Sequence, residues 1–171
     1  MKPPLPALLL VPAILACIVV AAWAWSRERL PQPSPELALH TLQGTRISLG
    51  ELRGRVAMVT FWATTCEICL REMPGLVDLH QDLGPRGLAV VAVAMPYDPA
   101  YLVAQYAATR KLPFTVALDL HGEAVQGFGG VAGTPTAFLI GKRGRVVERI
   151  VGAPDFARLR ARIESELSEP G

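Results

Sequence analysis

Two cysteines, Cys66 and Cys69, are the residues whose type and spacing most clearly allow chemistry, and they lie in "VTFWATTCEICLREMP", residues 59–74. Zinc sites normally use four ligands, and beside this pair the predicted domain offers only the scattered His40, His80 and His121. Covalent haem attachment needs a histidine directly after the second cysteine, where Leu70 stands. A static disulfide across two residues closes too small a loop to add much stability. The spacing therefore favours a redox-active dithiol.

The residues around the pair predict how it is positioned. The apolar run 56–62 predicts a buried central strand, and helical spacing of apolar residues from 68 to 83 predicts a helix that ends at Gly84. Cys66 would then open the helix, where free N–H groups and the helix dipole favour a thiolate. Cys69 would lie one turn further in and be more buried. We expect Cys66 to form a mixed disulfide and Cys69 to resolve it.

The remaining elements predict an α/β fold. Strands alternate with helices, which indicates crossover units and a parallel portion of sheet, and a closing hairpin adds antiparallel strands. We therefore predict a mixed central sheet with helices on both faces. The predicted elements are a hairpin at 36–52, strands at 87–95, 114–119, 134–140 and 145–151, a helix at 98–111 capped by Asp98, a short helix, and a helix at 154–167 capped by Asp155.

The N-terminus predicts a membrane segment. Residues 3–25 form an uncharged, largely apolar segment, and this segment is long enough for a membrane-spanning helix. We interpret residues 1–26 as an uncleaved signal anchor and Cys17 as a membrane-buried apolar side chain. The alternative is a signal peptide cleaved after "AWA" at 22–24. The proline-rich stretch 27–35 predicts a stiff tether to a single domain that covers residues 36–171.

The charge pattern excludes one kind of partner. The formal net charge is +2 and the lysines and arginines are scattered, so no nucleic-acid surface is predicted. Lys2 precedes the apolar segment, while Arg27 and Arg29 follow it. Charge alone therefore does not favour an outward-facing C-terminus.

A family resemblance extends these inferences. "FWATTCEICLREMP" followed by "GTPTAFLI" resembles the thioredoxin superfamily, and most closely its TlpA/ResA branch of membrane-anchored thiol–disulfide oxidoreductases, which includes DsbE/CcmG-like proteins. The likeness covers residues 36–167, including the hairpin typical of that branch. It implies a thioredoxin-like fold with the domain on the periplasmic side of the cytoplasmic membrane.

The resemblance also implies roles for individual residues. Cys66 and Cys69 match the redox-active disulfide, and Pro135 matches the cis-proline that faces it. The backbone of Thr134 would pair with an incoming extended peptide. Glu72 matches the acid of this branch, and its i,i+3 position places it near the face of Cys69. It would accept the proton of Cys69, because Thr60 stands where thioredoxin has a buried aspartate. The alternative is that Glu72 is an ordinary solvated glutamate on the helix surface.

Three neighbouring residues bear on how the pair reacts. The charge of Glu67, between the cysteines, opposes ionisation of Cys66, although a glutamate also suits a helix N-terminus for structural reasons alone. Thr65 and Ile68 stand where most relatives have tryptophan and proline. These departures leave the chemistry intact and put the usual reduction potential and partner in doubt.

The predicted function is a reductase of disulfides in extracytoplasmic proteins. The resemblance implies apocytochrome c as a substrate class and a membrane electron donor of the DsbD/CcdA type, and no cofactor is expected. An oxidase or isomerase would use the same residues, with the direction set by the potential. Two alternatives fit less well. A related peroxidase would have P-x-x-x-T-x-x-C, where this chain has Val59 and Ala63, and a Sco-type copper carrier would have C-x-x-x-C plus a distant histidine, for which only His121 is a weak candidate.

Overall fold

The computed structural model describes residues 14–18, which are helical, and residues 32–171. The predicted anchor lies largely outside these ranges, as do residues 27–31 of the tether. Residues 32–171 form one compact unit, so the last residues of the predicted tether, 32–35, belong to it. In the two described stretches, no helix combines the length and apolar character needed to cross a membrane.

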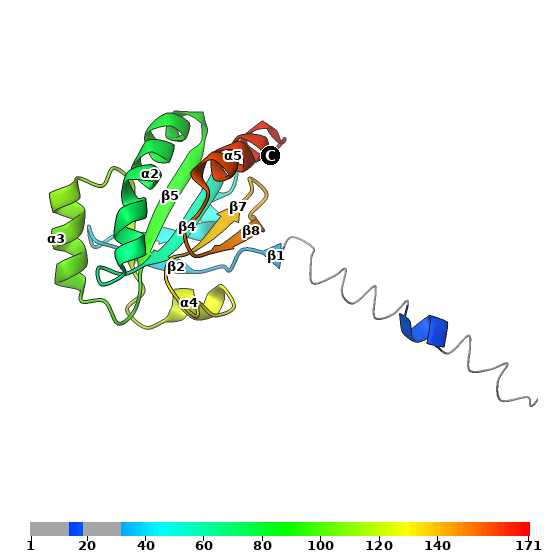
Figure 1. Cartoon of the computed structure of the whole chain (residues 1–171), viewed down its shortest axis with the longest axis horizontal. Coiled ribbons are helices and arrows are strands. Elements are labelled where there is room, and N and C mark those ends of the chain that lie inside the picture. The colour runs from blue at the N-terminus through cyan, green and yellow to red at the C-terminus, as the bar shows by residue number, and fades with distance from the viewer. Residues whose placement is uncertain (1–13, 19–31) are drawn as a thin grey trace, which may run out of the picture. The chain divides into compact units, whose positions relative to one another are not determined.

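A mixed sheet organises this unit. Over residues 32–171 eight strands pair in the order β1-β8-β7-β4-β5-β6-β2-β3 (Figure 1). The central strand β4 pairs in parallel with β5 and antiparallel with β7, as expected for crossover and hairpin connections. The strands are β1 (Gln32–Pro33), β2 (Ala38–Thr41), β3 (Arg46–Ser48), β4 (Val56–Trp62), β5 (Leu88–Ala94), β6 (Thr115–Leu118), β7 (Thr136–Ile140) and β8 (Arg145–Val151).

Helices cover both faces of the sheet and define two cores. Successive side chains of β4 point to opposite faces, so Met58 lies in one core and Val59 in the other. The first core packs against α2 (Glu67–Leu83), α3 (Ala100–Arg110) and α5 (Phe156–Ser168), and the second against the 3₁₀ turn η1 (Leu49–Leu52) and the short helix α4 (Glu123–Gly127). A further turn, η2 (Gly84–Arg86), follows α2. Because both faces are covered, β4 and β5 are buried along their whole length, as their continuous apolar runs predict.

Most predicted boundaries are confirmed. The N-terminal hairpin forms as β2–β3, α2 ends at Leu83 with Gly84 as its C-cap residue, and the carboxylate of Asp155 accepts hydrogen bonds from the first N–H groups of α5. One element was not predicted: Gln32 and Pro33 form β1 on the edge of β8. Its two residues are too few to give a periodic signal, and the three nearby prolines suggested a tether instead.

Candidate active site

The cysteine pair lies at the junction of the central strand and α2. β4 ends at Trp62, and a short loop leads to Cys66, which is the N-cap residue of α2. The sulfurs of Cys66 and Cys69 are bonded at 2.09 Å. The Cys69 backbone N–H also donates to the Cys66 sulfur at 3.2 Å. Cys66 is half-buried, whereas Cys69 is only 2% exposed.

This geometry distinguishes the two sulfurs chemically. An N-cap sulfur receives a backbone N–H group and lies at the positive end of the helix dipole, and both interactions stabilise a thiolate. The Cys69 sulfur lies among core side chains that do not solvate a charge. The arrangement therefore favours Cys66 as the sulfur that exchanges with external disulfides.

We expect alkylation of the reduced protein to label Cys66 well before Cys69. The reason is the difference in exposure and in thiolate stabilisation. Timed labelling with iodoacetamide, followed by peptide mass spectrometry, measures the order. Earlier labelling of Cys69 would contradict the assignment of the nucleophile.

Glu72 provides a buried acid one turn beyond Cys69. It is 8% exposed, and its Oε1 atom has no hydrogen-bond partner within the described part of the chain. Burial raises the pKa of Glu72 to about 7, an effect that the neighbouring Arg71 charge partly opposes. Such a carboxyl can both take up and release a proton near neutral pH, as the predicted role requires. Thr60 is buried in β4 and supplies no acid. The geometry permits Glu72 to accept the proton of Cys69, and this role stays a prediction.

Pro135 lies at the same end of the central strands as the loop that leads to Cys66. The Thr134–Pro135 peptide bond is cis, as the resemblance implied. The next residue, Thr136, pairs with Phe61 of β4, which places Pro135 beside the end of that strand. The Gly152 N–H donates to the Pro135 carbonyl at 2.9 Å. That carbonyl is therefore occupied, while the predicted pairing of the Thr134 backbone with a substrate stays a prediction.

Glu67 forms an ion pair on the surface of α2. Its carboxylate lies 2.6 Å from the guanidinium of Arg71, and both side chains are largely exposed. Solvent and Arg71 screen its charge, so any effect on Cys66 is small. Its position in the first turn also suits the helix dipole, which leaves both interpretations of Glu67 open.

Asp98 is a residue of this site that the sequence analysis assigned to a different role. Its buried carboxylate accepts hydrogen bonds from the N–H and the hydroxyl of Thr64, both at 2.6 Å. It therefore holds the loop two residues before Cys66. The predicted capping of α3 by Asp98 is wrong: the N-cap residue is Pro99, and no side chain caps that helix. The only available signal was an acid four residues after the end of β5, the strand that runs parallel to β4.

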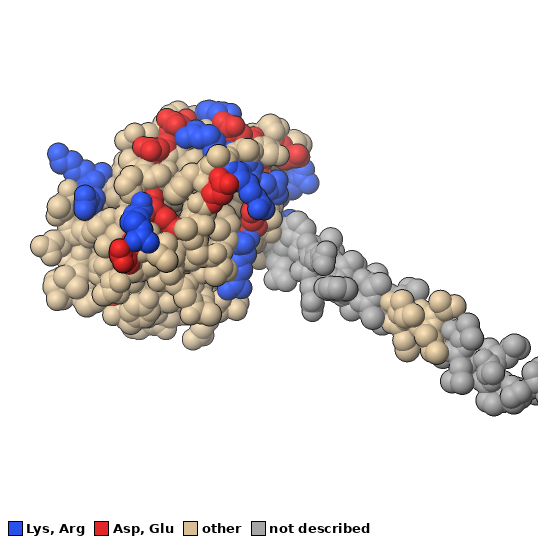
Figure 2. Space-filling view, viewed as in Figure 1, with Lys and Arg blue, Asp and Glu red and all other residues tan. Residues whose placement is uncertain are grey.

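Three exposed apolar side chains belong to segments at this end of the sheet. Ile68, between the cysteines, is 41% exposed, Tyr97 lies in the loop after β5, and Val151 pairs with Thr136 at the start of β7. In the view of Figure 2, charged side chains gather toward the end where α2 finishes and α5 lies, and few appear where α2 and α3 begin.

Comparisons with known proteins agree with this chemistry. The family model described as "AhpC/TSA family" matches residues 30–149. The thiol–disulfide oxidoreductase ResA of Bacillus thuringiensis is 32% identical over 126 residues, which cover 74% of this chain and 72% of the relative. ResA of Geobacillus thermodenitrificans is 30% identical over 132 residues, covering 77% and 75%. Among solved structures, a thioredoxin-family thiol:disulfide interchange protein from Chlorobium tepidum matches with a TM-score of 0.74 and 29% identity, covering 81% of this chain and 97% of that one.

Proposed function

Because the chain belongs to the AhpC/TSA family and is a thiol–disulfide oxidoreductase similar to ResA, we propose that it reduces disulfides of proteins outside the cytoplasm. The observation that carries the proposal is the pairing of a half-exposed N-cap sulfur, Cys66, with a buried sulfur, Cys69, beside the buried acid Glu72. Disulfides of the apocytochrome c class, which must be reduced before haem ligation, are the substrates that the resemblance implies.

The reaction proceeds through two exchanges. In the reduced protein the Cys66 thiolate attacks a substrate disulfide, so a Cys66–substrate bond forms, the substrate bond breaks, and the departing thiolate takes a proton from water. The Cys69 thiol then gives its proton to the Glu72 carboxylate and attacks the Cys66 sulfur. The mixed disulfide breaks and the second substrate thiolate leaves, taking up a proton. The substrate has gained two electrons and two protons, and the Cys66–Cys69 disulfide has re-formed.

The cycle closes when a donor returns two electrons to this disulfide. We assign that role to a membrane dithiol protein of the DsbD/CcdA type, which would attack the accessible Cys66 sulfur. An oxidase or isomerase would use the same atoms, so the direction depends on the reduction potential of the pair.

We expect the Cys66–Cys69 couple to have a reduction potential below about −220 mV, in the range of cellular reductants. Equilibration of the full chain with defined glutathione or dithiothreitol buffers, read out by mass after thiol trapping, measures this potential. A potential near −120 mV, typical of strong oxidants, would overturn the reductase direction and support the oxidase alternative.

The proposed location is the outer face of the cytoplasmic membrane. The uncharged segment 3–25 supports a membrane anchor. Residues 27–31 would connect that anchor to the compact unit, which begins at Gln32. An anchored domain would remain close to a membrane electron donor.

Removal of residues 1–26 is expected to release a soluble protein that keeps its thiol chemistry, because the compact unit begins after the deleted segment. The full chain should sediment with membranes and resist extraction by high salt. Cell fractionation and intact mass distinguish the outcomes. A full chain that stays in the soluble fraction at its unprocessed mass would contradict the anchor, and a mass shortened after residue 24 would identify a cleaved signal peptide.

A further inference from the structure

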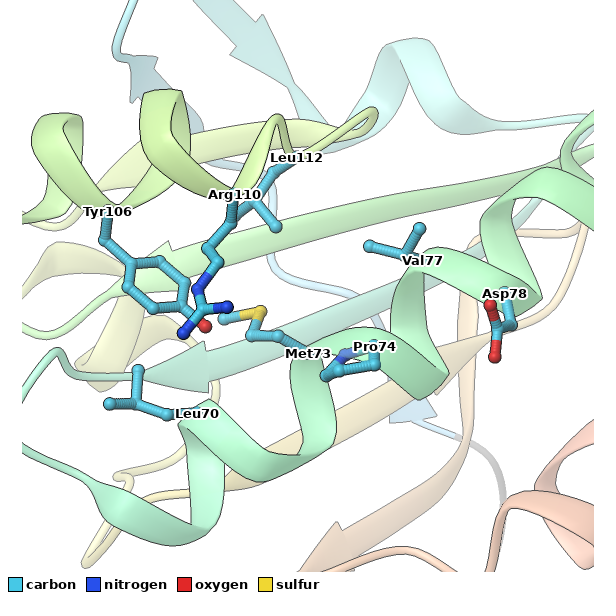
Figure 3. Close-up of a pocket in the computed structure, with 8 residues that line it drawn as sticks. All are labelled: Leu70, Met73, Pro74, Val77, Asp78, Tyr106, Arg110 and Leu112. Atoms are coloured by element: carbon cyan, nitrogen blue, oxygen red, sulfur yellow. The ribbon is translucent and has the colours of Figure 1, made fainter.

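A groove runs between α2 and α3 on the first face of the sheet. It has a volume of about 430 Å³, and Figure 3 shows side chains from both helices converging on it. We call it the α2–α3 groove and define it by Leu70, Met73, Pro74 and Val77 of α2 and Tyr106 and Arg110 of α3. The mechanism described above uses none of these side chains.

The α2–α3 groove is continuous with the surface next to the reactive disulfide. A second hollow of about 420 Å³ shares Tyr106 and Arg110 with the groove, and it is also lined by Thr64 and Thr65. Thr65 directly precedes Cys66 in the chain. Together the two hollows form a path that begins at Thr65, follows α3 and continues along α2.

The chemistry of the groove changes along its length. The section formed by Leu70, Met73 and Val77 is apolar. The guanidinium of Arg110 lies 5.8 Å from the centre of the Tyr106 ring, a cation–π contact that holds it over the groove. Within residues 32–171 Arg110 forms no ion pair, so its charge is available to a ligand. Asp78 lines the opposite end, beyond Val77 (Figure 3).

A substrate joined to Cys66 can place the residues next to its own cysteine against this surface. An extended chain advances about 3.3 Å per residue, so the residues within a few positions of the substrate cysteine reach Tyr106 and Arg110. The groove can hold an apolar side chain together with an adjacent carboxylate, which would pair with the arginine. A surface pair of this kind adds specificity more than affinity.

Given the proposed function, we propose that the α2–α3 groove binds the polypeptide next to the reacting cysteine of the substrate protein. It selects a segment with an acidic side chain placed at Arg110, followed by an apolar side chain that packs on Leu70, Met73 and Val77. Such a segment would contribute to the choice among exposed disulfides.

Reversing the charge of Arg110 and of the peptide tests the proposal. Two labelled peptides carry a central serine in place of the reacting cysteine. One has glutamate and the other lysine on both sides of this serine, with leucines further out, so that the peptide can bind in either chain direction. Fluorescence anisotropy measures their binding to the full chain in detergent. We expect Arg110→Glu to weaken binding of the glutamate peptide by about five-fold and to strengthen binding of the lysine peptide. Arg143→Glu, an equal charge change in the exposed β7–β8 turn, should alter neither.

The matching cysteine peptides, presented as disulfides, supply the kinetic readout. Arg110→Glu should raise KM for the glutamate peptide without changing kcat, and it should leave reduction of bis(2-hydroxyethyl) disulfide unchanged, because that small neutral substrate has no carboxylate and no neighbouring residues to reach Arg110. Equal peptide affinities in wild type and Arg110→Glu would overturn the groove while leaving the oxidoreductase function standing. A wild-type protein that binds the glutamate peptide through Arg110 but reduces no disulfide would instead contradict the proposed function and leave the groove in place.

Discussion

Replacing Cys66 by serine is expected to abolish disulfide reduction. A serine hydroxyl cannot attack a disulfide as a thiolate does, and Cys69 is too buried to meet a protein substrate. We therefore expect turnover of a protein disulfide such as insulin to fall to the uncatalysed rate. The aggregation of reduced insulin, followed by turbidity in the presence of dithiothreitol, measures the loss.

Cys17 offers a matched control for this result, because it is a free cysteine outside the candidate site. Cys17→Ser should keep wild-type turnover. Cys69→Ala should keep the first exchange and lose the second, so a mixed disulfide accumulates, and mass spectrometry of the trapped species in cells identifies the substrate. A Cys66→Ser variant with measurable turnover, or a Cys69→Ala variant that traps nothing, would contradict the assigned order of attack.

Replacing Glu72 by glutamine is expected to slow resolution of the mixed disulfide by about a hundredfold. The neutral amide cannot accept the Cys69 proton, and positioned bases typically contribute at least this factor. Stopped-flow reduction of a peptide disulfide separates resolution from the first exchange. The first exchange should keep its rate, because Cys66 is assigned to it and Glu72 is not.

The pH profile identifies the group responsible. With a pKa of about 7, Glu72 becomes the active base as the pH rises through 7, so wild-type resolution should increase up to that point and then level off. The Glu72→Gln profile should lack this inflection. Glu67→Gln changes an exposed glutamate on the same helix and is expected to retain the wild-type profile. Equal resolution rates in Glu72→Gln and wild type at every pH would contradict the proton-accepting role of Glu72.

Glu72→Gln is expected to slow the reaction and yet to stabilise the folded protein above neutral pH. The folded-state pKa of Glu72 is raised from 4.5 to about 7, so the folded protein holds a proton that the unfolded chain has already released between these values. Stability is therefore greatest below pH 4.5 and falls as the pH rises through 7. Glu72→Gln removes this loss, which amounts to at most about 3 kcal/mol. Urea unfolding of the oxidised protein should show the variant close to wild type at pH 5 and more stable at pH 8.

Local pattern was sufficient for much of this molecule. The apolar run of β4, the helical spacing after it and the two cysteines between them predict a strand–loop–helix unit with Cys66 at the start of the helix, and the structure has that arrangement. Glu72 could be placed beside Cys69 from helical periodicity alone. These inferences succeed because backbone geometry relates residues three or four positions apart in a fixed way.

Burial of those residues was a different matter. Periodicity places Glu72 on the face of Cys69, but only packing against the first core removes its carboxyl from water and raises its pKa. Free energies of desolvation depend on what covers a group, and the covering side chains come from other elements. The sequence alone therefore predicted the position of this acid and left open whether it was a solvated surface charge.

The cysteine pair and the order of the main elements could be predicted from the sequence. Which distant residues meet could be seen only in the folded protein: Asp98 holds Thr64 across 34 positions, Gln32 and Pro33 pair with the edge of β8, and α3 approaches α2 closely enough to form a groove. The physical reason is that short-range patterns follow from backbone geometry. Contacts between distant segments follow instead from the order of strands in the sheet and from how the helices pack on it, which no local periodicity specifies.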